Sequence, residues 1–330
     1  MDDNFFEFTE NLQNKSQNLI TIKQYKVAAC LTTYEDKEAA IRCLKAITSQ
    51  SFPIQKILIV DNSQKPLLTF QNNEEQVLIK HHPENIGTGG SLSWAIAWAT
   101  EQCYDFLWAF DQDSIVQKDC LSQLLSIYTK LNKPNYLIGI IAPTALDIRS
   151  NNIIDGAKFN HDQFIPYRPA IRDRPYECDS PITSGSLISL AAAKTISPPR
   201  ADLFIDGVDL DYGLRLRHQG FHNLIVPSAV MQHSFGNPVT VKFFQKERIE
   251  QKYSALRHYY ICRNHTYLDT RYAKGLYCLT SCLRRLKYMF SKIVFIMLYD
   301  SEDKALKIRA CLLGTYHGLK GKLGKTWQRT

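Results

Sequence analysis

An apolar run that ends abruptly in two carboxylates is the feature that most constrains the fold of this chain. Residues 106–110 read Phe-Leu-Trp-Ala-Phe, and Asp111 and Asp113 follow with one glutamine between them. Such a run is typical of a buried strand, and in an open parallel sheet ligands gather beyond the carboxyl ends of the strands. We therefore expect both carboxylates at a binding edge, where their oxygens suit Mg2+ or Mn2+ and the cation would hold a diphosphate. By itself, an Asp-x-Asp pair is equally typical of a polar turn.

The surrounding pattern predicts an α/β fold with a mostly parallel, Rossmann-like sheet and flanking helices. Strands are predicted near residues 26–33, 56–61, 76–81, 105–110 and 136–142, and helices over 36–50, 89–103 and 118–131. This order implies right-handed crossovers between parallel strands. After Pro143 the pattern fades, and it returns as a strand at 185–190 and a helix over 208–219 that ends at Gly220.

The chain divides into three regions. Residues 1–24 form a polar arm rich in Asn and Gln, residues 25–240 carry the α/β pattern, and residues 241–330 read as a basic, nearly all-helical region. A chain of 330 residues with 45% hydrophobic content is long enough to bury a full core.

Composition predicts a cytoplasmic protein. The nine cysteines are scattered without Cys-x-x-Cys pairs, which is typical of a reducing compartment. The acidic start of the chain lacks the positive flank of a signal peptide. The longest apolar stretch, Ile293–Tyr299, is far shorter than the roughly 20 residues that span a bilayer, so no transmembrane helix is expected.

Charge is distributed unevenly along the chain. Residues 241–330 contain 19 Lys and Arg against 6 Asp and Glu, whereas the first 240 residues contain 21 against 26. Between Cys282 and Phe295 the basic residues alternate with Tyr, Phe, Leu and Ile. This pattern suits a surface helix on anionic lipid, and equally a helical subdomain with a solvated basic face. No nucleic-acid-binding motif accompanies the charge, so no nucleic acid is expected as a partner.

Several motifs follow one another in a characteristic order. They are Val27–Tyr34, Lys56–Ser63, Asn85-Ile-Gly-Thr-Gly-Gly90, Asp111-Gln-Asp-Ser114, Thr183-Ser-Gly185, Phe204–Arg215 and Gln232–Gly236. This order resembles the inverting family 2 glycosyltransferases, which have the GT-A fold, and the resemblance covers about residues 25–265. The Asp-Gln-Asp-Ser motif and His258–Asn264 look most like bacterial rhamnosyltransferases. The Asn-x-Gly-x-Gly-Gly motif looks at least as much like galactofuranosyltransferases.

The resemblance implies a nucleotide-sugar site with contacts from several strand ends. Asp61 emerges after an apolar strand and would accept a hydrogen bond from the N3–H of a uracil or thymine ring, unless it only forms an Asp-Asn turn. The glycines would let the backbone approach a diphosphate at a helix N-terminus, or simply form a loop-to-helix turn. The expected donor-binding residues are Thr32, Thr33, Tyr34, Asp61, Asn85, Gly87, Gly89, Gly90, Asp111, Gln112 and Ser184.

Asp206, Asp209 and Asp211 are the catalytic candidates. The family pattern places its general base five positions before the Arg-bearing end of this motif, and Asp209 stands at the equivalent place before Leu214-Arg215. The usual acidic neighbour is replaced by Val208, which leaves Asp206 as a rival. On a regular helix Asp206 and Asp209 would share a face, while Asp211 would point elsewhere and orient the acceptor or complete the site. Acids at a helix start are also favoured by the helix dipole alone.

His233 is the third metal candidate after Asp111 and Asp113. It follows an apolar run and precedes Ser-Phe-Gly, where the family often has a metal-binding histidine. Neutral imidazole beside a carboxylate is acceptable to Mn2+. Outside that context, a lone histidine is more often a hydrogen-bonded structural residue.

The sequence thus predicts metal-dependent, inverting transfer of a hexose to a glycan or lipid-linked acceptor. The leading donor is dTDP-L-rhamnose, with UDP-galactofuranose and other UDP-sugars as alternatives. The protein would work in the cytoplasm or peripherally on the inner face of the plasma membrane, in polysaccharide biosynthesis. A sugar nucleotidyltransferase would share the sheet and the carboxylates, but it usually carries a Gly-rich basic loop where Thr33–Lys37 stands here. A non-catalytic nucleotide-sugar-binding protein is the remaining alternative.

Overall fold

The computed structural model describes residues 25–68, 76–234, 236, 238–243 and 246–327. The predicted polar arm, residues 1–24, lies outside the described residues. The fold is α/β, with a mostly parallel central sheet and flanking helices, as the sequence predicts.

The sheet is built around β1, which pairs in parallel with a strand on each side. β1 (Val27–Thr33) lies between β2 (Lys56–Asp61) and β4 (Phe106–Asp111), and β2 continues in parallel to β3 (Val77–His81). β2 and β4 are apolar runs that bury side chains on both faces, as parallel strands between helices must. Their carboxyl ends therefore meet at one edge of the sheet, where Thr32 is in register with Asp111.

In the other half of the sheet, both β11 (Leu187–Ser189) and the edge strand β10 (Tyr176–Cys178) run antiparallel to their neighbours. β11 lies between β4 and β6 (Ile138–Asp147), and β6 pairs in parallel with β12 (His222–His233). The full order is β10-β12-β6-β11-β4-β1-β2-β3. Short strands complete the described sheets: β5 (Ser114–Val116) on β12, β7 (Ile153–Ile154) on β6, and the pair β8 (Ala157–Asn160) and β9 (Gln163–Pro166).

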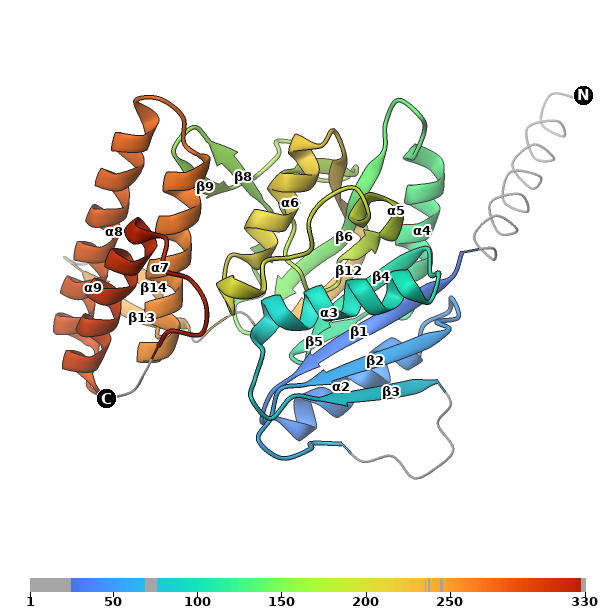
Figure 1. Ribbon diagram of the computed structural model, residues 1–330, viewed down its shortest axis with the longest axis horizontal. Coiled ribbons are helices and arrows are strands. Elements are labelled where there is room, and N and C mark those ends of the chain that lie inside the picture. Colours follow the sequence, from blue (N-terminus) through green and yellow to red (C-terminus); the bar gives the residue numbers. More distant parts are fainter. Residues whose placement is uncertain (1–24, 69–75, 235, 237, 244–245, 328–330) are drawn as a thin grey trace, which may run out of the picture.

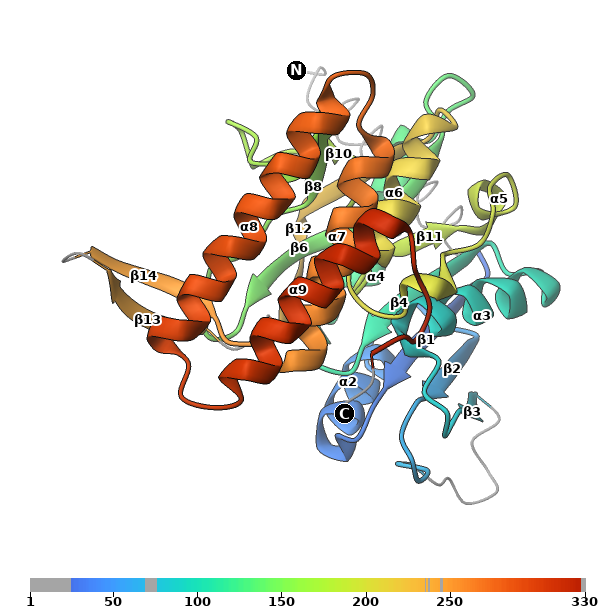
Figure 2. The same ribbon diagram turned by 60° about the vertical axis from the view of Figure 1, so that its left-hand side comes forward.

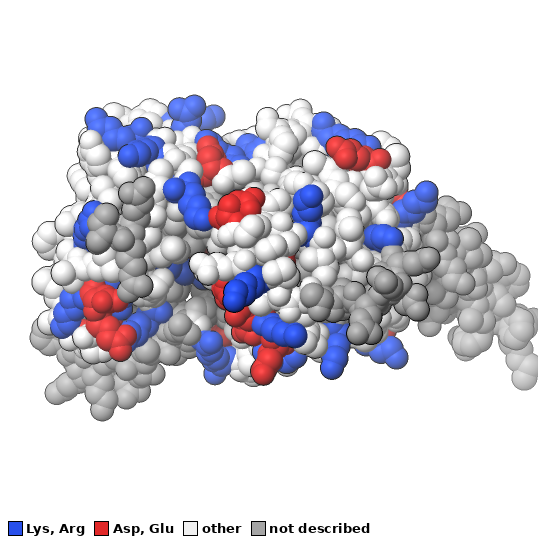
Figure 3. All heavy atoms as spheres, turned by 60° about the horizontal axis from the view of Figure 1, so that its bottom comes forward, with Lys and Arg blue, Asp and Glu red and all other residues white. Residues whose placement is uncertain are grey.

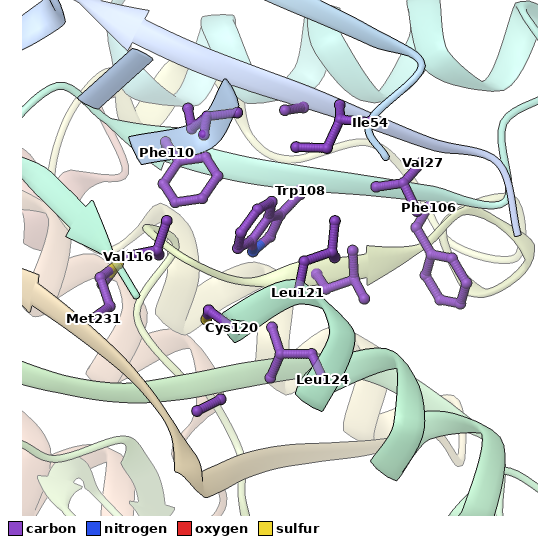
Figure 4. Packing of buried hydrophobic residues seen from close by; sticks show 14 of the residues in the cluster. Val27, Ile54, Phe106, Trp108, Phe110, Val116, Cys120, Leu121, Leu124 and Met231 are labelled. Atoms are coloured by element: carbon purple, nitrogen blue, oxygen red, sulfur yellow. The ribbon is translucent and has the colours of Figure 1, made fainter. Parts of the chain in front are cut away.

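Helices cover both faces of the sheet because successive strand residues point to opposite sides. One core cluster joins Val27, Ala29 and Leu31 of β1 to α2 (Lys37–Thr48) and α4 (Cys120–Leu131). Trp108 lies in this cluster beside Phe110, with Leu121 and Leu124 of α4 nearby (Figure 4).

The second cluster lies on the opposite face. Ala28 and Cys30 pack there with α3 (Gly87–Glu101) and α6 (Val208–His218). Two short helices, α5 (Leu190–Ala193) and the 3-10 turn η1 (Ala201–Leu203), complete this layer. Figure 1 shows α3 and α2 on opposite faces of the sheet.

The predicted C-terminal helices are present, but two strands that the sequence did not predict come before them. β13 (Pro238–Phe243) and β14 (Lys246–Gln251) form an antiparallel hairpin before the helices begin. Alternation of apolar with polar residues, as in Val-Thr-Val-Lys-Phe, is the strand signal that the sequence analysis missed. Three helices follow: α7 (Ala255–Tyr272), α8 (Tyr277–Tyr299) and α9 (Lys304–Lys320). They lie together beside the sheet (Figures 1 and 2).

α7 and α9 are in close backbone contact. A Cβ atom at Gly314 would overlap the carbonyl oxygen of Tyr259, and one at Gly318 would overlap that of Arg263. Because these two positions lack a side chain, α9 can pack directly against the backbone of α7. Among the described residues, no helix combines the length and apolar character needed to cross a bilayer.

Candidate active site

A cavity of about 1050 Å3 opens at the carboxyl ends of β1 and β4. The loop before α3, the loop before α6, the end of β12 and the start of α7 complete its wall. Most of the predicted site residues line it: Thr32, Thr33, Tyr34, Asn85, Gly87, Asp111, Gln112, Asp113, Ser184, Asp206, Asp209 and His233. Asp61, Gly89, Gly90 and Asp211 do not.

Asp111 ends β4 at the floor of the cavity. Its backbone N–H donates to Ser184 Oγ at 2.9 Å. Burial, followed by the nearby charges of Asp113 and Asp206, raises the pKa of Asp111, while His233 and Arg257 oppose that rise. A carboxylate in this setting is destabilised by like charge and would be stabilised by a bound cation.

His233 stands next to Asp113 because two strands bring them together. β5 pairs with the end of β12 so that Ser114 lies opposite His233. His233 Nδ1 is 2.8 Å from Ser114 Oγ and 3.4 Å from Asp113 Oδ1. Ser114 Oγ also lies 2.6 Å from Ser184 Oγ, which ties the histidine to the residue that holds Asp111.

The donor set of Asp111, Asp113 and His233 fits a hard or borderline divalent cation. Within the described part of the chain, no three His, Cys, Asp or Glu side chains are arranged as a finished metal site. The raised pKa of Asp111 is the observation that favours a cation here, because crowded carboxylates gain most from one.

Gln112 fixes the opposite wall of the cavity. Its side-chain oxygen accepts from the Tyr34 N–H at 2.7 Å, and its side-chain nitrogen donates to the Tyr34 carbonyl at 2.9 Å. These two hydrogen bonds between a side-chain amide and one backbone residue join the end of β1 to the turn after β4. Tyr34 itself is exposed at the mouth of the cavity.

Asp61 lies beneath the cavity wall rather than in it. Its Oδ1 accepts from Thr33 Oγ1 and the Ser63 N–H, both at 3.1 Å, and its Oδ2 accepts from the Leu67 N–H at 2.8 Å. Burial acts to raise the pKa of Asp61, but these hydrogen bonds lower it overall. The geometry is that of a turn-forming aspartate, one of the two interpretations that the sequence allows.

The glycines at the start of α3 serve contact with protein more than contact with ligand. The Gly89 N–H donates to the Phe204 carbonyl at 3.0 Å, and a Cβ at Gly89 would stand 2.6 Å from the Arg200 carbonyl oxygen. Gly87, with φ +70°, lines the cavity and is equally crowded by Phe204. These glycines therefore let the loop that precedes α6 lie directly on α3.

Asp209 lies in the first turn of α6 and faces the cavity. Its Oδ1 accepts from the Leu210 N–H at 2.9 Å. Burial, with added repulsion from Asp206 and Asp111, raises the pKa of Asp209 to about 6. A carboxylate with this pKa is ionised at neutral pH and is still a useful proton acceptor.

Asp206 and Asp211 have different partners. Asp206, at φ +62°, precedes the helix instead of sharing a face with Asp209, because α6 begins only at Val208. Its Oδ1 is 3.2 Å from Arg257 Nη2, and burial still raises its pKa. Asp211 is 2% exposed and is bound by Arg215 Nε at 2.8 Å and the Tyr272 hydroxyl at 2.7 Å. It thus joins α6 to α7 away from the cavity.

Two buried residues of α7 hold the loop that carries these acids. Arg263, fully buried, donates to the carbonyls of Asp202 at 3.1 Å and Leu203 at 2.9 Å. The Asn264 side-chain nitrogen lies 2.6–2.9 Å from the carbonyls of Leu203, Ile205 and Asp206. The same guanidinium donates to the Gly324 carbonyl and to Thr326 Oγ1 at 3.0 Å.

The cations of the site were not predicted. Arg257 and Lys325 line the cavity from the start of α7 and from the segment after α9, and Lys252 lines it just before α7. Arg257 immediately precedes the predicted His258–Asn264 motif, which was the available signal. Lys325 lies 240 residues from Asn85, which it contacts, and no local pattern marks it.

Comparison with known proteins gives a family match for part of the chain. Residues 29–175, somewhat less than half of the chain, match the family described as Glycosyl transferase family 2. No curated protein sequence matches the chain.

Among solved structures, the chain resembles the crystal structure of GalNAc-T7 with UDP, GalNAc and Mn2+. The TM-score is 0.53 at 13% identity, over 90% of this chain and 57% of that chain. Two crystal structures of S. aureus TarS, one of residues 1–349, give TM-scores of 0.49 and 0.48 at 12% and 15% identity. They are covered over 80% and 48% of their length, and this chain over 89% and 86%. The GalNAc-T7 likeness shows that the chain has the GT-A fold.

The Arg263 contacts predict that even a charge-conserving change is costly. In Arg263→Lys, a single ammonium cannot reach all the carbonyls that the guanidinium satisfies, so buried acceptors lose their partners. We expect the free energy of unfolding, measured by urea denaturation, to fall by more than about 2 kcal/mol. Arg271→Lys, at an exposed position of the same helix, is the matched control and should change it by less than about 0.5 kcal/mol. Equal effects of the two changes would contradict the role given to Arg263.

Proposed function

We propose that this protein is an inverting glycosyltransferase that moves a sugar from a nucleotide diphosphate donor to a hydroxyl of a glycan or lipid-linked acceptor. The observation that carries the proposal is the position of Asp209. It faces the same cavity as Asp111 and Asp113, with a pKa of about 6. A proton acceptor and a cation-binding pair in one cavity are what such a transfer requires.

In the proposed mechanism, Asp209 takes the proton of the acceptor hydroxyl as the oxygen attacks C1 of the sugar. The attack comes from the face opposite the diphosphate, so the configuration at C1 inverts without a covalent enzyme intermediate. Asp206 is a weaker candidate for the base, because Arg257 already binds one of its oxygens. Asp211 would have a supporting role outside the cavity, because its bonds to Arg215 and Tyr272 join α6 to α7.

Asp111, Asp113 and His233 would hold Mg2+ or Mn2+, which supplies positive charge for the departing diphosphate. Arg257 adds a protein cation beside Asp206. Thr32, Thr33 and Tyr34 would contact the nucleoside, and Asp61 would shape that wall through its bonds to Thr33 and Leu67. Gln112 keeps the wall in place through Tyr34, and Ser184 orients Asp111.

The donor that we favour is dTDP-L-rhamnose, on the resemblance of the Asp-Gln-Asp-Ser and His258–Asn264 motifs. UDP-galactofuranose and other UDP-sugars are the alternatives. The nucleotidyltransferase alternative is weakened by the loop after β1. In place of a Gly-rich basic loop, Asp36 caps α2 at once, its side chain accepting from the Ala39 N–H at 2.9 Å.

A donor panel tests the function. With Mn2+ or Mg2+ present, the purified protein should hydrolyse or transfer from one of a set of dTDP-, UDP- and GDP-sugars, with dTDP-rhamnose first. EDTA should abolish the reaction, and added Mn2+ or Mg2+ should restore it. Full activity of thoroughly chelated protein would remove the metal role. Binding of a nucleotide sugar without turnover on any acceptor would favour the non-catalytic alternative.

The base assignment is tested by charge and by pH. Asp209→Asn should lower kcat by about 100-fold or more, with a largely unchanged KM for the donor. In the wild type, kcat should be constant above pH 7 and should fall about tenfold per pH unit below about pH 6, because the carboxylate then takes up a proton.

A second readout separates catalysis from folding. A raised pKa means that the charged form of Asp209 costs folding free energy above the pKa of the unfolded chain, so the neutral asparagine should not lower Tm at pH 8. Glu101→Gln, at an exposed position of α3, is the control. Loss of turnover in Asp206→Asn but not in Asp209→Asn would reverse the assignment.

We also propose that the outer face of α8 rests on an anionic membrane. Exposed apolar residues recur at intervals of three, four and seven from the N-cap of the helix onward: Leu276, Leu279, Leu283, Leu286, Phe290 and Met297. α8 and α9 contain no Asp or Glu. Figure 2 shows the two helices side by side, in front of α7. Membrane-surface helices combine such an apolar stripe with basic neighbours.

On this face, exposed apolar area would contribute more to membrane attachment than basic charge, because some of the basic residues are paired within the protein. Arg284 is paired with Asp162 at 2.7 Å, and Arg285 with Asp269 at 3.6 Å. Lys287 is exposed beside the stripe. The adjoining face seen from below carries Asp and Glu among its Lys and Arg (Figure 3). A second copy of the chain is the less suitable occupant, because Lys287 would meet its own equivalent with no acid on α8 to receive it.

The membrane proposal is tested on the full chain. At low salt the wild type should sediment with vesicles that contain anionic lipid, and less so at high salt, because each cation contributes about 1 kcal/mol that salt screens. The double variant Leu283→Glu, Phe290→Glu should stay in solution, whereas Ile171→Glu, an exposed apolar residue elsewhere, should sediment normally. A lipid-free dimer that the double variant dissociates would identify the face as a contact between copies instead.

A further inference from the structure

The chain returns to the cavity after its last helix. α9 ends at Lys320, and Gly321 follows in the left-handed conformation with φ +68°. Residues 321–327 then run from the end of α9 toward the carboxyl end of β1 (Figure 2). This segment, 321–327, reaches the loop before α3, where Lys325 joins the lining of the cavity.

Segment 321–327 is anchored on both sides of Lys325. The Gly324 N–H donates to the Asp202 carbonyl at 2.6 Å, and the buried Arg263 donates to the Gly324 carbonyl. On the other side, Thr326 Oγ1 lies 2.7 Å from the Tyr259 hydroxyl and accepts from Arg263 at 3.0 Å. The Trp327 ring packs on the Tyr259 ring at 5.1 Å. A segment held this closely gives the intervening residue a fixed position.

The ammonium group of Lys325 has partners that leave its charge uncompensated. Its Nζ donates to the carbonyl oxygens of Glu84 and Asn85, and it lies 5.6 Å from the centre of the Phe204 ring. Among the residues that the structure describes, no carboxylate is within ion-pair distance of it. Arg257 and Lys252, by contrast, are paired with Asp206 and Asp300. Lys325 is thus a positioned cation at the cavity without an acidic partner.

We propose that Lys325 binds the diphosphate of the nucleotide donor. The lysine contacts Asn85 and lines the same cavity as Gly87 and the carboxylates Asp111 and Asp113. Three donor hydrogens on Nζ let it keep its carbonyl contacts and add a phosphate oxygen. Positive charge there binds the donor and also stabilises the leaving group. This inference rests on the proposed function, because it needs a nucleotide diphosphate in the cavity.

Titration calorimetry of the full-length protein with UDP and dTDP, each in the presence of Mn2+, tests the proposal. Lys325→Ala should weaken binding of the tighter nucleotide by about tenfold or more, the scale of one lost hydrogen bond to a charged group. Binding of the matching monophosphate, UMP or dTMP, should weaken by less than about threefold. Lys325→Arg should retain most of the affinity. Lys322→Ala removes an exposed lysine from the same segment and should leave both affinities unchanged.

The outcomes separate the inference from the proposed function. If the wild type binds neither diphosphate, both fall together. If it binds one and Lys325→Ala binds it equally well, the inference alone is overturned. It is also overturned if the diphosphate and the monophosphate lose affinity equally, because Lys325 would then hold the loop at Glu84 and Asn85 and not the phosphate. Unchanged Tm values for the two alanine variants confirm that folding is not the cause.

Discussion

The fully buried guanidinium of Arg263 is the constraint on which the candidate site depends. It has no carboxylate partner for its charge among the described residues, and burial accordingly lowers its pKa. Its compensation comes from backbone carbonyls and from the faces of Tyr260 at 4.6 Å and Tyr259 at 5.7 Å. Because carbonyl groups have fixed positions along a chain, this arginine and Asn264 together dictate the path of residues 202–206. The loop is thus held mainly by hydrogen bonds to its backbone. Such bonds are directional, and a buried acceptor that loses its donor costs free energy.

The acids in and around the cavity have different hydrogen-bonding and charged neighbours, and these neighbours distinguish their roles. Asp61 is bound by N–H and O–H donors, which lower its pKa, and Asp211 is bound by Arg215 and Tyr272. The carboxylate oxygens of both residues are therefore occupied by partners within the protein. For Asp111 and Asp209, burial raises the pKa, and neighbouring carboxylates raise it further: Asp113 and Asp206 act on Asp111, and Asp206 and Asp111 act on Asp209. Carboxylates held in mutual repulsion are a stored cost, and such a cost is expected where a proton or a cation is to be received.

Local signals in the sequence predicted the central strands, the helices between them and part of the cavity wall. The apolar run into Asp111 gave β4 and its carboxylates, and Gly220, at φ +90°, ended the helix that begins at Val208. These predictions succeed because a strand end and a helix end depend on a few adjacent residues. Asp61 shows the limit of such reasoning. An aspartate after a strand looks the same in sequence whether it faces a ligand or turns back to bind the Leu67 N–H.

The residues that the sequence did not reveal come from contacts between distant segments. Lys325 meets Asn85, and Asp206 meets Arg257 51 residues later, only because α7 and α9 pack beside the sheet. The β13–β14 hairpin was missed for a different reason, because its local signal, the alternation of apolar and polar residues in Val-Thr-Val-Lys-Phe, was not recognised. The glycines at the start of α3 were recognised as points of close approach, but the approaching group is the Phe204 carbonyl.

The basic residues of the C-terminal region therefore do not all contribute to one positively charged surface. Arg263 holds the loop before α6, Arg257 and Lys325 enter the cavity, and Lys307 is buried against Asp300 at 2.7 Å. Charges used inside cannot also attract a membrane, which leaves the apolar stripe of α8 as the larger contribution to any attachment there. These contacts also show that residues 241–330 are structurally integrated with the first 240 residues. The loop before α6 is held by α7, and Arg257 and Lys325 enter the cavity from α7 and segment 321–327, so the cavity takes this form only when the two regions fold against each other.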